Sequence, residues 1–182
     1  DGAIGGYFAW DHYGQPGQFT GWKQMPEIKN SNLSLPFNKQ NDMAMACLRI
    51  WRCTGEESYR EKALKIFSFM RSRFQYFDEH YLWNYWEPLG PHDLKPSHEG
   101  ARHWMGVHPY RNYQAGEVGD VVEAYHYGVV FDRTDLERII RLNLKVMWNG
   151  SISDPAFRNS NVTLPGYRKP SASKAYPTRA GT

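Results

Sequence analysis

Cysteines are few in this sequence of 182 residues, and glycine motifs for nucleotide binding and long apolar runs are missing from it. Its two cysteines, Cys47 and Cys53, fall in one predicted helix and point to different faces, so we expect two core thiols with no bridge between them. Neither GxGxxG nor GxxxxGK[ST] occurs, which leaves nucleotide binding without support. No apolar stretch approaches the ~18 residues of a membrane-spanning helix, so we expect no membrane partner.

Common catalytic signatures are missing as well. The sequence has no GxSxG nucleophile elbow and no HExxH zinc motif. His98, His103 and His108 recur every five residues, a spacing that fits loop ligands but not one face of a helix. We therefore expect no bound metal, no cofactor, and no serine or cysteine nucleophile.

Charge is low overall but unevenly distributed. The net charge of +3 is too small to require a nucleic acid, and no RNA-type aromatic motif is present. Residues 92–111 nevertheless contain three Lys or Arg residues and four histidines against two acids. Residues 158–179 contain five basic residues and no acid. Two basic segments of this kind favour an anionic partner, although the small net charge does not require that partner to be a nucleic acid.

Tryptophan and tyrosine are abundant, and aromatics make up 15% of the chain. Such side chains fill a core, but exposed ones also stack on the apolar CH faces of sugar rings. Trp83, Trp86 and Trp104 are the candidates for this second role. The sequence alone leaves both uses open.

Hydrophobic periodicity predicts one helical domain. Apolar residues at helical spacing predict a helix over 38–54 ended by Gly55, and a second helix opening at Glu56. A third helix is predicted over 117–131, and a capping box of Thr134 and Glu137 opens a fourth. The ranges of this single domain are an aromatic, glycine-rich loop region over 1–36, two helical hairpins over 37–150, and a C-terminal loop region over 151–182.

A long polar and aromatic loop separates the two predicted hairpins. Pro88 and Pro91 block helix continuation, and we expect loop structure to about Ala115. Its part from Ser97 to Glu117 carries three histidines, two arginines and two tyrosines. Loops of this length inside a compact domain are usually functional. We therefore interpret it as the wall of a site.

The run over 35–74, with its polar opening and its Thr54-Gly55-Glu56 turn, resembles helical hairpins of the (α/α) toroid carbohydrate-active enzymes. That group includes polysaccharide lyases, glycoside hydrolases and uronyl epimerases, and the likeness covers roughly 37–150. It implies an all-α fold of antiparallel hairpins of (α/α) toroid type, with substrate in a cleft lined by loops and aromatics. Four helices make only an incomplete toroid, so we expect further helices from a longer chain or from another subunit. The start at Asp1 rather than Met agrees with a processed or partial chain.

The favoured function is cleavage of an acidic, uronic-acid polysaccharide by β-elimination. Such a lyase neutralises the substrate carboxylate, removes the proton alpha to it and protonates the leaving oxygen. Arginine, histidine and tyrosine are suited to these three tasks in that order. The catalytic candidates are Arg102, His103, Tyr110 and Tyr113. The candidates for substrate binding are Asn38, Gln40, Trp83, Trp86, Trp104, His108 and Arg111.

Two alternatives remain open. A glycoside hydrolase needs two carboxyl groups flanking the scissile bond, and Glu87 is then the acid, with Glu99, Glu117 or Asp120 as its partner. Glu117 is also predicted to open a helix, where the dipole alone favours an acid. A non-catalytic polysaccharide-binding protein would use the tryptophans alone. For a protein acting on a polysaccharide we expect an extracellular or periplasmic location.

Overall fold

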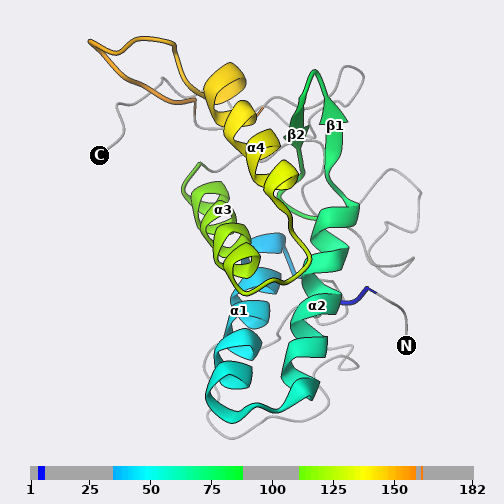
Figure 1. Cartoon of the computed structure of the whole chain (residues 1–182). Coiled ribbons are helices and arrows are strands. Elements are labelled where there is room, and N and C mark those ends of the chain that lie inside the picture. Colours follow the sequence, from blue (N-terminus) through cyan, green and yellow to red (C-terminus); the bar gives the residue numbers. More distant parts are fainter. Residues whose placement is uncertain (1–3, 7–34, 88–110, 159–160, 162–182) are drawn as a thin grey trace, which may run out of the picture.

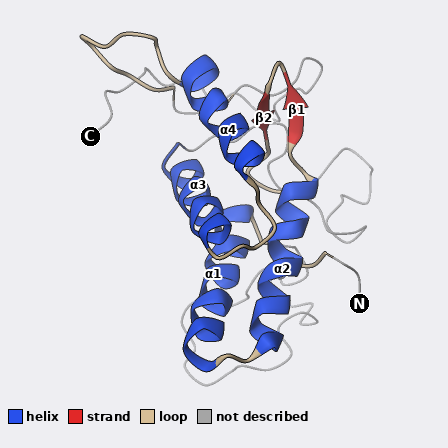
Figure 2. Ribbon diagram, in the orientation of Figure 1, coloured by secondary structure: helices blue, strands red, loops and turns tan. Residues whose placement is uncertain are grey.

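A computed structural model describes residues 4–6, 35–87, 111–158 and 161 of the chain. Helices dominate the described part, so the predicted helical character is confirmed, with one small two-stranded sheet that the sequence did not predict (Figure 2). None of the described helices is both long enough and apolar enough to span a bilayer. In chain order the elements are α1 (Phe37–Thr54), α2 (Glu57–Ser72), β1 (Gln75–Phe77), β2 (His80–Leu82), α3 (Arg111–His126), α4 (Arg133–Leu142) and a π-helical turn η3 (Asn143–Met147).

The first hairpin agrees with the prediction. Helix α1 ends at Gly55, whose φ of 74° lies in the left-handed region that glycine adopts without a steric penalty. The Gly55 N–H donates to the Trp51 carbonyl oxygen at 2.7 Å and so satisfies one of the last carbonyls of the helix. Helix α2 then returns along α1 and buries Ala63, Phe67 and Met70 against it.

Helix α3 begins at Arg111, six residues before the predicted start at Glu117. The predicted loop was therefore too long at its C-terminal end. The buried stripe of α3 consists of Gln114, Glu117, Val121 and Ala124, at the i, i+3, i+7 spacing of one helix face. Its first two members are polar, so a search for apolar periodicity finds only the later part of the helix.

The start of α4 also differs from the prediction. Asp132, rather than Thr134, is the N-cap, and it forms a reciprocal capping box with Asp135. The Asp135 N–H donates to Asp132 Oδ1 and the Asp132 N–H donates to Asp135 Oδ2, both at 3.0 Å. Asp135 is the third residue of the helix, a position at which the usual capping box has glutamate or glutamine.

The four helices alternate in direction. In Figure 1, α1 and α3 run the same way and α2 and α4 run the opposite way. Side-chain pairing agrees with this, because Asp42 lies near Asp120 and, further along both helices, Arg49 pairs with Glu123. The described part of the chain is thus two antiparallel hairpins with α1 and α3 packed side by side.

Strands β1 and β2 form a hairpin in a stretch that the sequence predicted as loop. Tyr76 pairs with Tyr81 and Phe77 with His80 across the two strands. The turn residues Asp78 and Glu79 have φ of 44° and 66°, the positive values that two-residue hairpin turns require. Since neither residue is glycine, this turn carries local strain.

The double substitution of Asp78→Asn and Glu79→Gly is expected to stabilise the protein by about 1 kcal/mol, because asparagine and glycine adopt positive φ with less strain. The change also removes the exposed ion pair between Lys145 and Glu79, which we expect to cost little. Urea unfolding of the double variant measures the effect. The single change Glu79→Gln, which removes the charge but not the strain, serves as the control, and equal stability of both variants would contradict the strain argument.

Aromatic side chains join the hairpins into one core. Phe74 contacts Tyr81, Trp83 and Phe131, with ring centroids 4.9, 5.4 and 6.1 Å away. Cys47 belongs to this core, but Cys53 is exposed near the end of α1, so the prediction of two core thiols was wrong for Cys53. Both thiols are free, as expected.

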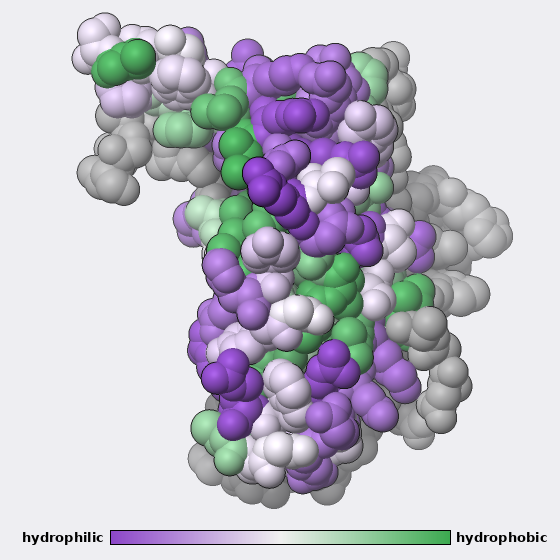
Figure 3. All heavy atoms as spheres, in the orientation of Figure 1, coloured by the Kyte–Doolittle hydropathy of each residue, from purple (hydrophilic) through white to green (hydrophobic). Residues whose placement is uncertain are grey.

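Apolar side chains also reach the surface along α4. Ile140 and Leu144 are both more than half exposed, and Figure 3 shows hydrophobic atoms along one edge of this helix. Both residues therefore lie outside the core. The structure instead buries Ile139, Leu142 and Met147.

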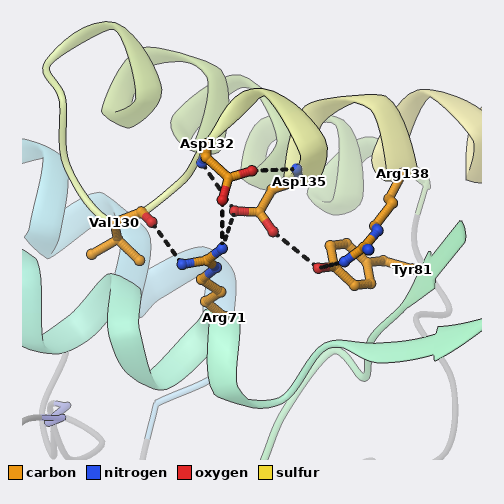
Figure 4. Close-up of polar contacts among 6 residues, drawn as sticks. All are labelled: Arg71, Tyr81, Val130, Asp132, Asp135 and Arg138. Carbon is orange, nitrogen blue, oxygen red and sulfur yellow. Dashed lines mark hydrogen bonds and ion pairs between the residues drawn. The ribbon is translucent and has the colours of Figure 1, made fainter.

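A polar network centred on the buried Asp135 carboxylate attaches α4 to α2 and β2 (Figure 4). Arg71 of α2 pairs with Asp132 at 2.8 Å and Asp135 at 3.0 Å, and it donates to the Val130 carbonyl oxygen at 3.1 Å. The Tyr81 hydroxyl of β2 donates to Asp135 Oδ1 at 3.0 Å. Because the Asp135 side chain is only 1% exposed, these partners replace the water that its carboxylate would otherwise bind.

Candidate functional site

Acidic side chains gather where α3 faces α1. Glu117, Asp120 and Glu123 recur at i, i+3 and i+6 on α3, and Asp42 lies opposite them on α1. Residues three apart on a helix are surface neighbours, so this spacing directs the acids toward one side of α3. We call these four residues the inner carboxyl group.

Glu117 is the most deeply buried member of the inner carboxyl group, with no exposed surface. The Trp83 indole N–H donates to its Oε2 at 2.7 Å. Asn161 in turn donates to the Trp83 carbonyl oxygen at 3.1 Å, which fixes the position of the tryptophan. Glu117 is therefore an interior residue of α3 held by a tryptophan, and the prediction that it opens a helix was wrong.

Asp120 is the member with the most altered acidity. Burial raises the pKa of its carboxyl group, and the charges of Asp42, Glu117 and Glu123 raise it further. The Arg49 guanidinium lowers the pKa in part, and the net result is a value of about 7. A carboxyl group of this kind is protonated in a large fraction of molecules at neutral pH, which is what a general acid requires.

Arg49 is held mainly by another acid. Its Nη2 lies 3.1 Å from Glu123 Oε2, and the hydrogen bond and charge of Glu123 raise the pKa of the guanidinium. This ion pair connects α1 to α3 at the surface. Burial is the largest cause of the raised pKa of Asp120, followed by the charges of Asp42, Glu117 and Glu123.

Several buried amide oxygens lie in the same elements as the inner carboxyl group or beside them. Within the described ranges, the Oδ1 atoms of Asn38, Asn41 and Asn84 and Oε1 of Gln114 are buried and accept no hydrogen bond from the protein. The main chain brings these elements together, because the Phe37 N–H donates to the Tyr85 carbonyl oxygen at 3.0 Å. Such oxygens are acceptors suited to hydroxyl groups or ordered water.

Glu87 lies after Trp86 and is half-buried. Burial raises the pKa of its carboxyl group, while a hydrogen bond from Asn84 and the charge of Arg73 lower it in part. Glu87 is not among the charged groups that shift the pKa of Asp120, which are Asp42, Glu117, Glu123 and Arg49. The pairing of Glu87 with Glu117 or Asp120 as two catalytic acids stays a prediction.

Comparison with known proteins gives no assignment. No known family, curated protein or solved structure matches this chain. Among the described side chains, no group of three or more His, Cys, Asp and Glu residues is arranged to hold a metal ion.

Most of the predicted lyase residues cannot be placed. Arg102, His103, Trp104, His108 and Tyr110 lie outside the described residues, as does Glu99. Arg111 is the first residue of α3, and its side chain is also outside the description. Tyr113 is the one predicted catalytic residue of the lyase whose position is described. Its ring is 39% exposed and stacks on Tyr85, with centroids 5.7 Å apart.

Three of the predicted binding residues are buried, and their role in binding stays a prediction. Trp83 and Trp86 are fully buried, so neither ring presents a face for a sugar. Gln40 is also fully buried, and its side-chain amide donates to the Leu35 carbonyl oxygen at 3.2 Å. Asn38 is half-buried, and its open acceptor stays compatible with a binding role.

Asn41, Asp42 and Gln114 were not predicted as site residues from the sequence, and Asp120 was considered only as a partner of Glu87. One signal for them was present. Asn41 and Gln114 stand at helical spacing with apolar residues that are buried further along the same faces. Amides in the core stripe of a helix are costly unless they have partners, which makes such positions candidates for a site.

Proposed function

We propose that this chain belongs to an enzyme that cleaves a polysaccharide by acid catalysis, with Asp120 as the proton donor. The carrying observation is the half-buried Asp120 carboxyl group, whose pKa of about 7 lets it hold a proton at neutral pH. Cleavage of a glycosidic bond requires a proton on the leaving oxygen. Asp120 can give that proton and take it back from water in a later step.

An (α/α) toroid is the architecture we propose around this site. Two antiparallel hairpins with α1 and α3 side by side and parallel are the repeating unit expected of such an array (Figure 1). The inner carboxyl group then lies on the paired helices α1 and α3. Further helices, from a longer chain or another subunit, would complete the array.

Hydrolysis is the reaction that the described residues favour. Besides Asp120, a hydrolase needs a second carboxylate, and Asp42 lies near it on the facing helix. Asp42 is exposed, and its carboxyl group pairs with Lys39 at 3.0 Å. In this scheme Asp42 accepts a proton from the attacking water, and Asp120 protonates the departing sugar oxygen. The amide oxygen of Asn38, a half-buried residue in the first turn of α1, is an acceptor compatible with a sugar hydroxyl.

Elimination from an acidic polysaccharide is the second candidate, and Tyr113 favours it. This tyrosine is partly exposed in the first turn of α3. The N-terminus of a helix carries a partial positive charge, which stabilises a phenolate or a substrate carboxylate nearby. In that reaction Arg102, His103 and Tyr110 keep the roles predicted from the sequence. For either reaction we propose an extracellular or periplasmic location.

A panel of neutral and acidic polysaccharides tests these proposals. Release of reducing ends without new ultraviolet absorbance marks hydrolysis, and absorbance of an unsaturated uronate product marks elimination. Each product should disappear in the matching variant, Asp120→Asn or Tyr113→Phe, with Ile152→Ala as a control remote from both. No cleavage of any polymer by the wild-type protein would contradict the enzyme proposal. The buried positions of Trp83 and Trp86 argue against the simple binding protein that would have used their rings.

A further inference from the structure

The β1–β2 hairpin presents an aromatic ring to solvent. Tyr76 is 57% exposed, which is the highest value among the exposed aromatic residues in the described part of the chain. Its neighbour Phe77 is also exposed, but successive side chains of a strand point to opposite faces, so the two rings serve different surfaces. Tyr76 is on the face toward Tyr81 and Arg138, and Phe77 is on the face toward His80.

Contacts on one side hold the Tyr76 ring in place. The Arg138 guanidinium carbon lies 4.5 Å from the ring centroid, and Tyr81 meets the ring edge-on at 6.2 Å. Arg138 is itself fixed, because its Nη1 donates to the Tyr81 hydroxyl at 2.6 Å and the Tyr81 hydroxyl is bound to Asp135 (Figure 4). An exposed ring that is already ordered loses little conformational entropy when a ligand stacks on it.

Positive charge borders this ring. Arg138, Arg141 and Lys145 follow one another along α4 and η3 at spacings of three and four residues. Lys145 pairs with Glu79 in the hairpin turn at 3.1 Å, and the charge of Arg141 also acts on Glu79, which places Arg141 beside the hairpin. Arg141 is exposed and has five N–H donors in a planar arrangement that matches a carboxylate or a sulfate.

We propose that Tyr76 and Arg141 form a binding subsite for an acidic sugar residue of a polysaccharide, separate from the inner carboxyl group. The apolar CH face of the sugar stacks on the open side of the Tyr76 ring. The guanidinium of Arg141 binds the carboxylate or sulfate of the same or the next sugar. This inference rests on the proposed function for the choice of a polysaccharide, and it adds a place where the polymer is held away from the reacting bond.

Electrophoresis through gels that contain polygalacturonate, alginate or hyaluronan tests the subsite. Wild-type protein is expected to be retarded by at least one of these polymers, and Tyr76→Ala and Arg141→Ala should each weaken the binding about tenfold. Tyr76→Phe keeps the ring and should bind as the wild type does. Phe77→Ala, on the opposite face of the same strand, should also bind normally. Added salt should weaken wild-type binding, since part of it is electrostatic.

Several results would overturn the subsite. The first is normal retardation of a folded Tyr76→Ala variant, and the second is no retardation of the wild type by any of the three polymers. The third is that the Tyr76→Ala variant loses self-association and keeps its polymer binding. Thermal midpoints of all variants establish that they are folded. Cleavage of short oligosaccharides should be unchanged in Tyr76→Ala. Polymer binding that depends on Tyr76 in a protein with no cleaving activity would refute the proposed function and leave the subsite standing.

Discussion

Asp135→Ala is expected to lower the free energy of unfolding by about 2–4 kcal/mol, because it leaves Arg71 and the Tyr81 hydroxyl without their shared buried acceptor. For a domain of this size the thermal midpoint should fall by roughly 5–15 °C. The same change removes half of the capping box at the start of α4. Urea unfolding followed by circular dichroism measures the loss.

A matched control for this prediction lies on the same helix. Glu137 also forms an ion pair, with Arg133 at 2.9 Å, but both side chains are largely exposed. Glu137→Ala should therefore change the free energy of unfolding by less than about 0.5 kcal/mol. Equal effects of the two substitutions would show that burial of the Asp135 network contributes little to stability.

Asp120→Asn is expected to reduce the rate of polysaccharide cleavage by about 10²–10⁴-fold, the usual contribution of a general acid. The amide of asparagine keeps the size of the side chain but has no proton to transfer at this pKa range. In the wild type the rate should fall as the pH rises through about 7, since the acid is then lost. Asp42→Asn removes a charge that raises the pKa of Asp120. Any cleavage activity that the Asp42→Asn variant retains should therefore decline at a lower pH than that of the wild type. A full rate in Asp120→Asn would exclude the proposed role.

The same variant has a consequence for stability that does not depend on substrate. The pKa of Asp120 is about 7 in the folded protein and ordinarily near 4 in an unfolded chain, so the folded state binds more protons between these values. Stability is therefore lost as the pH rises through this window. Asp120→Asn should melt at a higher temperature than the wild type at about pH 8 and at a similar temperature at about pH 4. A difference that does not vary with pH would contradict the altered acidity of Asp120.

Local sequence signals predicted the first hairpin well. The apolar spacing of α1 and the glycine at its end are both short-range features, and Gly55 fills the left-handed position that the turn requires. The same approach failed at the start of α3, because Gln114 and Glu117 occupy core positions with polar side chains. It left the burial of Trp83 undecided, because that burial depends on contacts with Glu117 and Phe74, which are distant in the sequence or lie beyond a turn.

The candidate site was predictable in composition but not in placement. Sequence reasoning found Glu87 and Tyr113 and considered Asp120, yet the altered acidity of Asp120 arises from α1 and α3 lying side by side. No local pattern encodes the distance between Asp42 and Asp120. The capping box of α4 shows the same limit at short range, since a Thr-Asp-Leu-Glu match competed with the Asp132 and Asp135 pair that forms.

The segment from Trp83 to Tyr85 also bears on the order in which the molecule folds. Tyr85 accepts a hydrogen bond from the Phe37 N–H at the start of α1, and Trp83 donates to Glu117 in α3. Each bond spans a long stretch of chain, so neither is gained until a large loop has closed. We therefore expect α1 and α2 to pair early through local contacts, and α3 to dock only after this connecting segment is in place. Assembly in that order makes the carboxyl-bearing face of α3 one of the last parts of the protein to reach its native position.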